Sequence, residues 1–270
     1  IEYFENLEYQ GNKTTRRYTQ SVDGDNITST KYSYNIVDED GKTILNLDRS
    51  WSQNNDGSTT TVINGKTFTA TFDDSSKSII VTDCQGNTTF IDIPAKLKGV
   101  DDFSLKYYGS QEASYNEFYQ LCKNMPADML LELNYYNKNI KLVSKCDSSY
   151  SRNLLEISAT NSQDNFGVVA HELGHAIDDL KCISEDDILI KIYNDEISNF
   201  EATYPKSMQE NIKYFDQKGG SSGTGLAELV AETNMLYKSY NRTSSDTIRA
   251  QYLVQYFPRT LAYILNVLNE

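Results

Sequence analysis

The sequence contains little histidine and little positive charge. Its 270 residues include two His and one Trp, and 25 Lys and Arg stand against 38 Asp and Glu, which gives a formal net charge of −13. Nucleic acids and anionic membranes bind to basic surfaces that displace counterions, so this charge balance excludes an extended contact with either. A neutral or cationic partner, such as a polypeptide, is compatible with it.

Long apolar segments are also absent. A membrane-spanning helix needs about 18 or more consecutive apolar residues, and the chain has no such run. The chain opens on Ile1 rather than Met and continues into polar, charged sequence without the apolar centre of a signal peptide. We therefore expect a mature or trimmed form without a transmembrane segment.

Cysteine spacing excludes one kind of metal site. The four cysteines are separated by tens of residues and form no CxxC pair, the spacing that zinc knuckles use. Two interpretations remain open for them: free thiols, or one disulfide between Cys122 and Cys146. The full set is Cys84, Cys122, Cys146 and Cys182.

The first third of the chain has the pattern of an antiparallel β-meander. Between about residues 16 and 94, short segments rich in Thr, Val, Ile and Tyr alternate with turn sequences such as DEDG, NNDG and CQGN. Asn64-Gly65 is the dipeptide that favours a type I′ hairpin turn. We predict a β-rich accessory domain over residues 1–97, in which the meander forms an up-and-down sheet, a small barrel or a sandwich.

After Pro94, apolar residues recur with the period of a helix. Helices are expected over residues 111–125, 126–136, 166–180, 184–200, 225–240, 245–257 and 259–269, and short strands in NIKLV (139–143) and LLEISAT (154–160). We therefore predict an α+β protein in which residues 98–270 form a mostly helical domain with a short sheet.

Both histidines lie in one expected helix, NFGVVAHELGHAIDDL, residues 165–180. His171 and His175 are four positions apart, so both rings lie on one side of the helix and can meet a single metal ion, while Glu172 projects beside them. This pattern predicts a Zn²⁺ site with His171 and His175 as ligands. Glu172 would be the general base that takes a proton from the attacking water.

A catalytic zinc ion takes three protein ligands and one water. Since the chain has no third histidine, the remaining ligand is expected to be a carboxylate. Glu228 and Glu232 lie one helical turn apart in the apolar segment GTGLAELVAETNML. We predict Glu228 as the ligand, with Glu232 as the alternative. The other glutamate, and one of Asp178 and Asp179, would accept the free N–H of a ligand histidine.

These motifs resemble a known family, the zinc metallopeptidases of the anthrax lethal factor type, which include the secreted Pro-Pro endopeptidases. The family motif HE(F/L)GHA(V/I)DD matches HELGHAIDD, residues 171–179, and the family's E-x-x-A-E helix matches ELVAE, residues 228–232. The similarity continues weakly into YFPRTLAYI and covers roughly residues 100–270. The resemblance implies a zincin-type metallopeptidase domain with zinc on His171, His175 and Glu228 and with Glu172 as general base.

One position departs from the family pattern. The family has a tyrosine seven residues before the third ligand, where it stabilises the oxyanion of the tetrahedral intermediate, and this sequence has Ser221 there. Tyr214, earlier in the chain, is the alternative donor. Loss of such a donor would slow catalysis without preventing metal binding.

The resemblance implies a zinc endopeptidase that is a secreted toxin or effector protease, extracellular or delivered into a target cell. Its polypeptide substrate would lie in extended form along LLEISAT, taken as an edge strand. The alternative is a zinc-binding pseudoprotease or protein-binding module with attenuated catalysis, prompted by Ser221. A third hypothesis, compatible with the enzyme, is that the β-meander is a binding or translocation module that carries the metallo-domain as toxic cargo.

Overall fold

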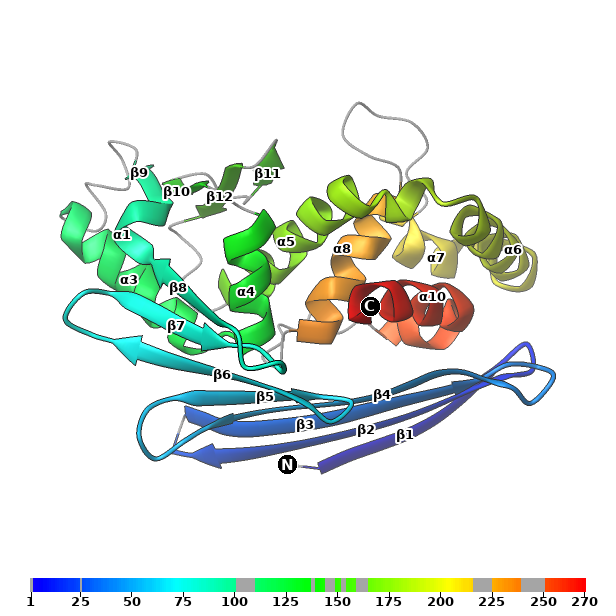
Figure 1. The fold of residues 1–270 in the computed structure, drawn as a ribbon. Helices are drawn as coiled ribbons and strands as arrows, with labels where there is room; N and C mark the ends of the chain where they lie inside the picture. The colour runs from blue at the N-terminus through cyan, green and yellow to red at the C-terminus, as the bar shows by residue number, and fades with distance from the viewer. Residues whose placement is uncertain are drawn as a thin grey trace.

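The computed structural model of the chain describes residues 2–24, 26–100, 110–136, 139–143, 149–151, 154–158, 165–215, 225–238 and 251–270. Within these ranges the protein is α+β: a large antiparallel sheet comes first, and helices with a second, smaller sheet follow (Figure 1). The predicted fold class is confirmed at this level.

Eight strands form the large sheet in the order in which they occur along the chain. They are β1 (Glu2–Tyr9), β2 (Asn12–Asp23), β3 (Asn26–Val37), β4 (Thr43–Gln53), β5 (Thr59–Ile63), β6 (Lys66–Asp73), β7 (Ser78–Thr82) and β8 (Thr88–Asp92). The hairpin predicted between β5 and β6 is confirmed, because Asn64 and Gly65 both have positive φ, 47° and 80°. Both central residues of a type I′ turn need that backbone region.

Of the three forms expected for this meander, the up-and-down sheet is confirmed, and the barrel and the sandwich are wrong. Within the described residues the sheet is open, with β1 and β8 at its edges. In β4, Leu45, Leu47 and Trp51 are buried, whereas Asn46 and Asp48 face solvent. Helices α4 (Ala127–Tyr136) and α10 (Pro258–Asn269) pack on the buried face (Figure 1). These helices cover the apolar side, so neither closure nor a second sheet is required.

The smaller sheet has four strands in the order β11-β12-β10-β9. They are β9 (Leu97–Val100), β10 (Asn139–Val143), β11 (Ser149–Ser151) and β12 (Leu154–Ser158). β9, β10 and β12 run parallel, and β11 pairs antiparallel with β12. LLEISAT is therefore not an edge strand over Leu154–Glu156, because β11 pairs with these residues on the side away from β10. Its last two residues, 159 and 160, lie outside the described residues.

Helices make up most of the remaining described chain. They are α1 (Ile93–Lys96), α3 (Gln111–Lys123), α5 (Asn165–Lys181), η1 (Ile183–Glu185), α6 (Asp187–Thr203), α7 (Lys206–Gln209), η2 (Glu210–Ile212) and α8 (Gly225–Lys238), and residues 251–256 are also helical. Each predicted helix has a counterpart within a few residues, except that the beginning of the one expected at 245–257 lies outside the described ranges. None of these helices is long and apolar enough to span a membrane.

Buried charges join the large sheet to the helices. Arg49, on β4, donates two hydrogen bonds to the carboxylate of Asp128 on α4, at 2.9 and 2.7 Å. Lys238, at the end of α8, lies 3.3 Å from the same carboxylate and also pairs with Glu132. The apolar core likewise runs without a break from the sheet into the helices. The two predicted domains therefore share one interior.

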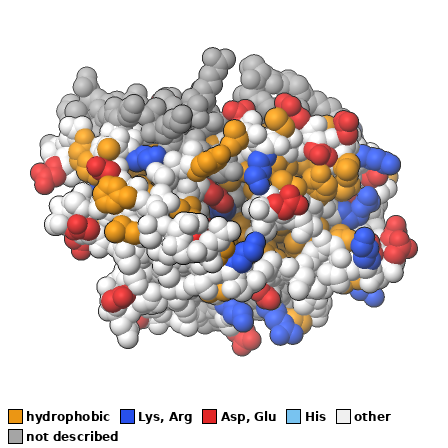
Figure 2. Space-filling model, viewed as in Figure 1, with side chains coloured by type: hydrophobic (Ala, Val, Ile, Leu, Met, Phe, Trp, Pro, Cys, Tyr) orange, Lys and Arg blue, Asp and Glu red, His pale blue; other side chains and the backbone are white. Residues whose placement is uncertain are grey.

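Charges of both signs are mixed on one face of the described surface. On the face in Figure 2, Lys and Arg side chains lie interspersed with Asp and Glu.

Cys84 and Cys182 are exposed free thiols, and Cys122 is a buried free thiol. The disulfide considered between Cys122 and Cys146 is therefore wrong for Cys122, while residue 146 lies outside the described ranges.

Candidate metal centre

Helix α5 carries both histidines because its apolar residues bury the adjacent side of the helix. Val169, Ala170, Leu173 and Ile177 are at most 2% exposed and follow the spacing of one helical face. His171 and His175, one turn apart, lie beside this stripe with their side chains 14% and 21% exposed. The histidines are thus reachable from solvent while their backbone is anchored in the core.

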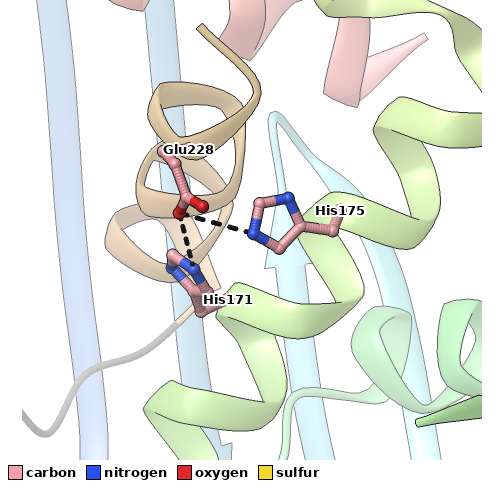
Figure 3. Close-up of side chains that lie close together, drawn as sticks. All are labelled: His171, His175 and Glu228. Atoms are coloured by element: carbon pink, nitrogen blue, oxygen red, sulfur yellow. Dashed lines mark ion pairs between the residues drawn. The ribbon is translucent and has the colours of Figure 1, made fainter. Parts of the chain in front are cut away.

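Helix α8 brings the carboxylate of Glu228 to the histidines. The two helices approach closely at Gly174, where an added Cβ would lie only 2.7 Å from the Cα of Ala231. That separation leaves no room for any side chain, so glycine at this position permits the crossing. Glu228 lies one turn before Ala231 on α8, and it reaches across to the rings (Figure 3).

The three side chains form a set of ligand atoms of the right size for one ion. Oε2 of Glu228 lies 3.3 Å from Nε2 of His171 and 3.5 Å from Nε2 of His175. Ligand atoms bonded at about 2.0–2.1 Å to a tetrahedral zinc ion are about 3.4 Å apart. Among the described residues, these three are the group of His, Cys, Asp and Glu that could hold a metal, with ligand atoms within 4.8 Å of one another. Two imidazoles and a carboxylate are also a donor set that zinc accepts.

The local electrostatics favour a cation at this point. Burial raises the pKa of Glu228, but hydrogen bonds with His171, His175 and Tyr214 outweigh it and hold the pKa well below its ordinary value. Burial lowers the pKa of His171, and the hydrogen bond to Glu228 with the nearby Glu232 and Glu172 carboxylates reverses this and raises it. These acids favour the positively charged form of the His171 ring, and a dication at this point would supply positive charge instead.

Glu232 lies on the other side of His171 from Glu228. Its Oε1 is 3.9 Å from Nδ1 of His171, and the residue is only 3% exposed. Glu228 faces the Nε2 atoms of both rings, whereas Glu232 approaches the remaining nitrogen of one. This arrangement suits the assignment of Glu228 to the metal and of Glu232 to the orientation of His171.

Glu172, the predicted general base, lies between the two histidines on α5 and is 8% exposed. Its carboxylate is close enough to His171 to act on the pKa of that ring. The structure thus brings together all four residues selected from the sequence. Tyr214 joins them, because its hydroxyl donates a hydrogen bond to Oε2 of Glu228. Ser221 lies outside the described residues.

The two acidic residues after the second histidine differ in burial, and the role predicted for one of them stays a prediction. Asp178 is buried, and its Oδ1 accepts a hydrogen bond of 2.7 Å from the backbone N–H of Ser184. It thereby holds the turn that follows α5. Asp179 is exposed. Helix α6 is capped by Asp186, whose side chain accepts from Ile188 N and Leu189 N.

Asn234 and Gly174 were not singled out by the sequence argument, although both shape the site. Asn234, on α8, is 0% exposed and donates a hydrogen bond of 2.7 Å to the carbonyl of Ala170 on α5. A sequence signal existed in both cases: an amide within an otherwise apolar helix, and a glycine in the interior of the HELGH segment.

The fold and site together define an α+β protein with a candidate metal centre of two histidines and one glutamate on crossing helices. Comparisons with protein-family models, with curated proteins and with solved structures find no match for the chain. The geometry of this centre and the motifs in the sequence are therefore the features that indicate a function.

Proposed function

We propose that the protein is a zinc-dependent endopeptidase that hydrolyses peptide bonds of a protein substrate. The observation that carries this proposal is the convergence of Glu228 Oε2 on Nε2 of His171 and of His175, at separations suited to tetrahedral zinc. The resemblance of residues 171–179 and 228–232 to lethal factor-type metallopeptidases supports it. On the same resemblance we propose that the protein is a secreted toxin or effector.

The roles of the side chains follow from their positions. A zinc ion held by His171, His175 and Glu228 would lower the pKa of a bound water and polarise the scissile carbonyl. Glu172 would accept the proton of the attacking water and deliver it to the leaving amine. The Tyr214 hydroxyl, held beside the same centre by Glu228, would donate a hydrogen bond to the oxyanion. Tyr214 is our choice for the role left open between it and Ser221.

Strand β11 is the best candidate for aligning the substrate. It forms the edge of the small sheet within the described residues, runs antiparallel to β12 and packs against α5. An extended peptide could add to this edge through backbone hydrogen bonds and so lie near the histidines. This proposal moves the substrate from LLEISAT, where the sequence argument placed it, to the neighbouring strand.

The function is tested by zinc content and by cleavage in one experiment. Elemental analysis of the purified protein should give one zinc per chain, and mass spectrometry should detect cleavage of a mixed peptide library. Glu172→Gln should retain zinc and lose cleavage by about 100-fold or more, because it removes the general base. Glu185→Gln, which changes an exposed acid, is the matched control.

Each outcome separates the candidate functions. One zinc per chain with cleavage that Glu172→Gln removes supports the endopeptidase. One zinc with no cleavage of any peptide overturns the endopeptidase and favours the zinc-binding pseudoprotease. A protein that binds no zinc under any condition contradicts both.

A further inference from the structure

The contact between α5 and α8 contains a buried amide whose presence the fold alone does not explain. Nδ2 of Asn234 donates to the carbonyl oxygen of Ala170, but Oδ1 of Asn234 is buried without a hydrogen-bond partner among the described residues. Burying an unpartnered polar oxygen is destabilising, and an apolar side chain of the same size would avoid it. The hydrogen bond to Ala170 is therefore the contact that sets the amide apart from an apolar side chain at this position.

The position of this hydrogen bond indicates what it contributes. Ala170 immediately precedes His171, and its carbonyl is the α-helical acceptor for the N–H of Gly174. A Cβ added to Gly174 would lie 3.0 Å from Cβ of Asn234 and 2.7 Å from Cα of Ala231. The bond from Asn234 thus lies beside the close approach of the two helices at Gly174, so a sliding movement of either helix would strain it.

A change in the register of α8 would act directly on the ligands. Glu228 lies six residues before Asn234 on the same helix, and its Oε2 must stay 3.3 and 3.5 Å from the two histidine nitrogens. One residue along a helix corresponds to about 1.5 Å of rise and about 100° of rotation. Even a fraction of such a step would take the carboxylate away from tetrahedral positions.

We propose that Asn234 is a positioning residue for the metal centre: its hydrogen bond to Ala170 sets the register of α8 on α5, so that Glu228 meets both histidines. This inference rests on the proposed metal site. Asn234 touches neither the ion nor the substrate and acts through Glu228 and His171. Close packing at Gly174 brings the helices together, and the Asn234 amide selects one register among those that close packing allows.

The neighbouring residue on α8 offers a matched control. Thr233 is also 0% exposed, and its hydroxyl donates a hydrogen bond of 2.7 Å to the carbonyl of Leu229 within the same helix. Thr233→Val removes a buried hydrogen bond of equal length without touching the link between the helices. Asn234→Leu removes the link and keeps the volume, and Asn234→Ala is a second variant that cannot overpack.

The experiment measures zinc affinity by competition with a chromophoric chelator, the d–d spectrum of the Co²⁺-loaded protein, and the thermal unfolding of the metal-free protein. We expect Asn234→Leu to bind zinc about 10- to 100-fold more weakly than the wild type, the loss typical of residues that orient metal ligands. Its Co²⁺ spectrum should change, while metal-free Asn234→Leu unfolds no earlier than metal-free Thr233→Val. Thr233→Val should keep both the zinc affinity and the Co²⁺ spectrum of the wild type.

Three results would overturn the inference. The first is an Asn234→Leu variant with the zinc affinity and Co²⁺ spectrum of the wild type. The second is that neither Asn234 variant folds although Thr233→Val does, since the amide would then serve the fold itself. The third is a wild type that binds no zinc, and only this one also removes the proposed function.

Discussion

The hydroxyl of Tyr214 donates a hydrogen bond to Oε2 of Glu228, the same oxygen that faces Nε2 of both histidines. A phenol held at this point lies on the ligand side of the centre, next to the position that zinc would occupy. Tyr214 comes from the turn after η2, fourteen residues before Glu228, rather than from the position that the family pattern indicates. The relationship leads to a test of which residue supplies the oxyanion donor.

Tyr214→Phe should retain zinc and lose activity. The substitution removes one donor to the transition state, and the loss of an oxyanion donor costs about 100- to 1,000-fold in kcat. Steady-state kinetics on the best library peptide, with zinc content measured in parallel, check this. Tyr252→Phe is a suitable control, because its hydroxyl bonds to Asn211 rather than to the metal centre. Unchanged kcat in Tyr214→Phe would remove Tyr214 from the mechanism.

Glu228→Gln and Glu232→Gln should weaken zinc binding to different extents. We expect about a 10- to 100-fold loss for Glu232→Gln, because Glu232 only approaches Nδ1 of His171, and a larger loss for Glu228→Gln, which alters a ligand. Zinc titration against a competing chelator measures both. The opposite order would show that the ligand assignment is wrong by one helical turn.

The large sheet and the helices should unfold together. Trp51 is the only tryptophan of the chain and lies buried on β4, so its fluorescence reports on the sheet, while circular dichroism reports on the helices. Since both share one core and the Arg49–Asp128 pair, the two urea transitions should coincide. A sheet that unfolds separately from the helices would contradict this expectation.

Removal of Arg49 from the buried Arg49–Asp128 pair should destabilise the protein. Arg49→Met leaves Asp128 with Lys238 as its remaining cation, and we expect it to lower the free energy of unfolding by about 3 kcal/mol. Arg17→Met makes the same change on the exposed face of β2 and should cost less than about 1 kcal/mol. Chemical denaturation of both variants measures the difference, and equal losses would count against a role for the buried pair.

The free energy of unfolding should decrease as the pH rises, because Glu196 ionises. This residue on α6 is 2% exposed and accepts hydrogen bonds from the backbone N–H groups of Arg259 and Thr260, at 2.9 and 3.0 Å. Burial raises its pKa from 4.5 to about 7, and the hydrogen bonds from Thr260 and Arg259 limit the rise. The folded state therefore keeps a proton that the unfolded state releases. The contribution of Glu196 to the free energy of unfolding is fully present below pH 4.5 and is lost as the pH rises through about 7.

The expected loss from Glu196 is on the order of 3 kcal/mol. Urea denaturation at about pH 5 and about pH 8 should show it in the wild type and not in Glu196→Gln, which cannot ionise. Other acids contribute equally to both proteins, so the difference between the two pH dependences isolates Glu196. Identical pH dependences would contradict a raised pKa.

Local patterns sufficed for most of the elements and for the placement of His171, Glu172 and His175 on one helix. Val169, Leu173 and Ile177 recur at helical spacing, so the face of α5 beside the histidines could be read without knowing what it packs against. The same holds for the Asn64-Gly65 turn, because the two residues themselves adopt the positive φ angles that the turn needs. The sequence did not predict which separate segments pack together. β11 pairs with β12, and α4 and α10 cover the face of the large sheet on which a second sheet was considered.

The sequence by itself determined that two histidines and Glu172 share one helix, because a separation of four residues brings side chains together whatever surrounds them. Only the tertiary structure decided which glutamate meets them and that Tyr214 and Asn234 belong to the site. Those contacts join residues 14 to 64 positions apart. They depend on how closely and in which register α5 and α8 cross, and that is a property of packing at Gly174 rather than of any local pattern.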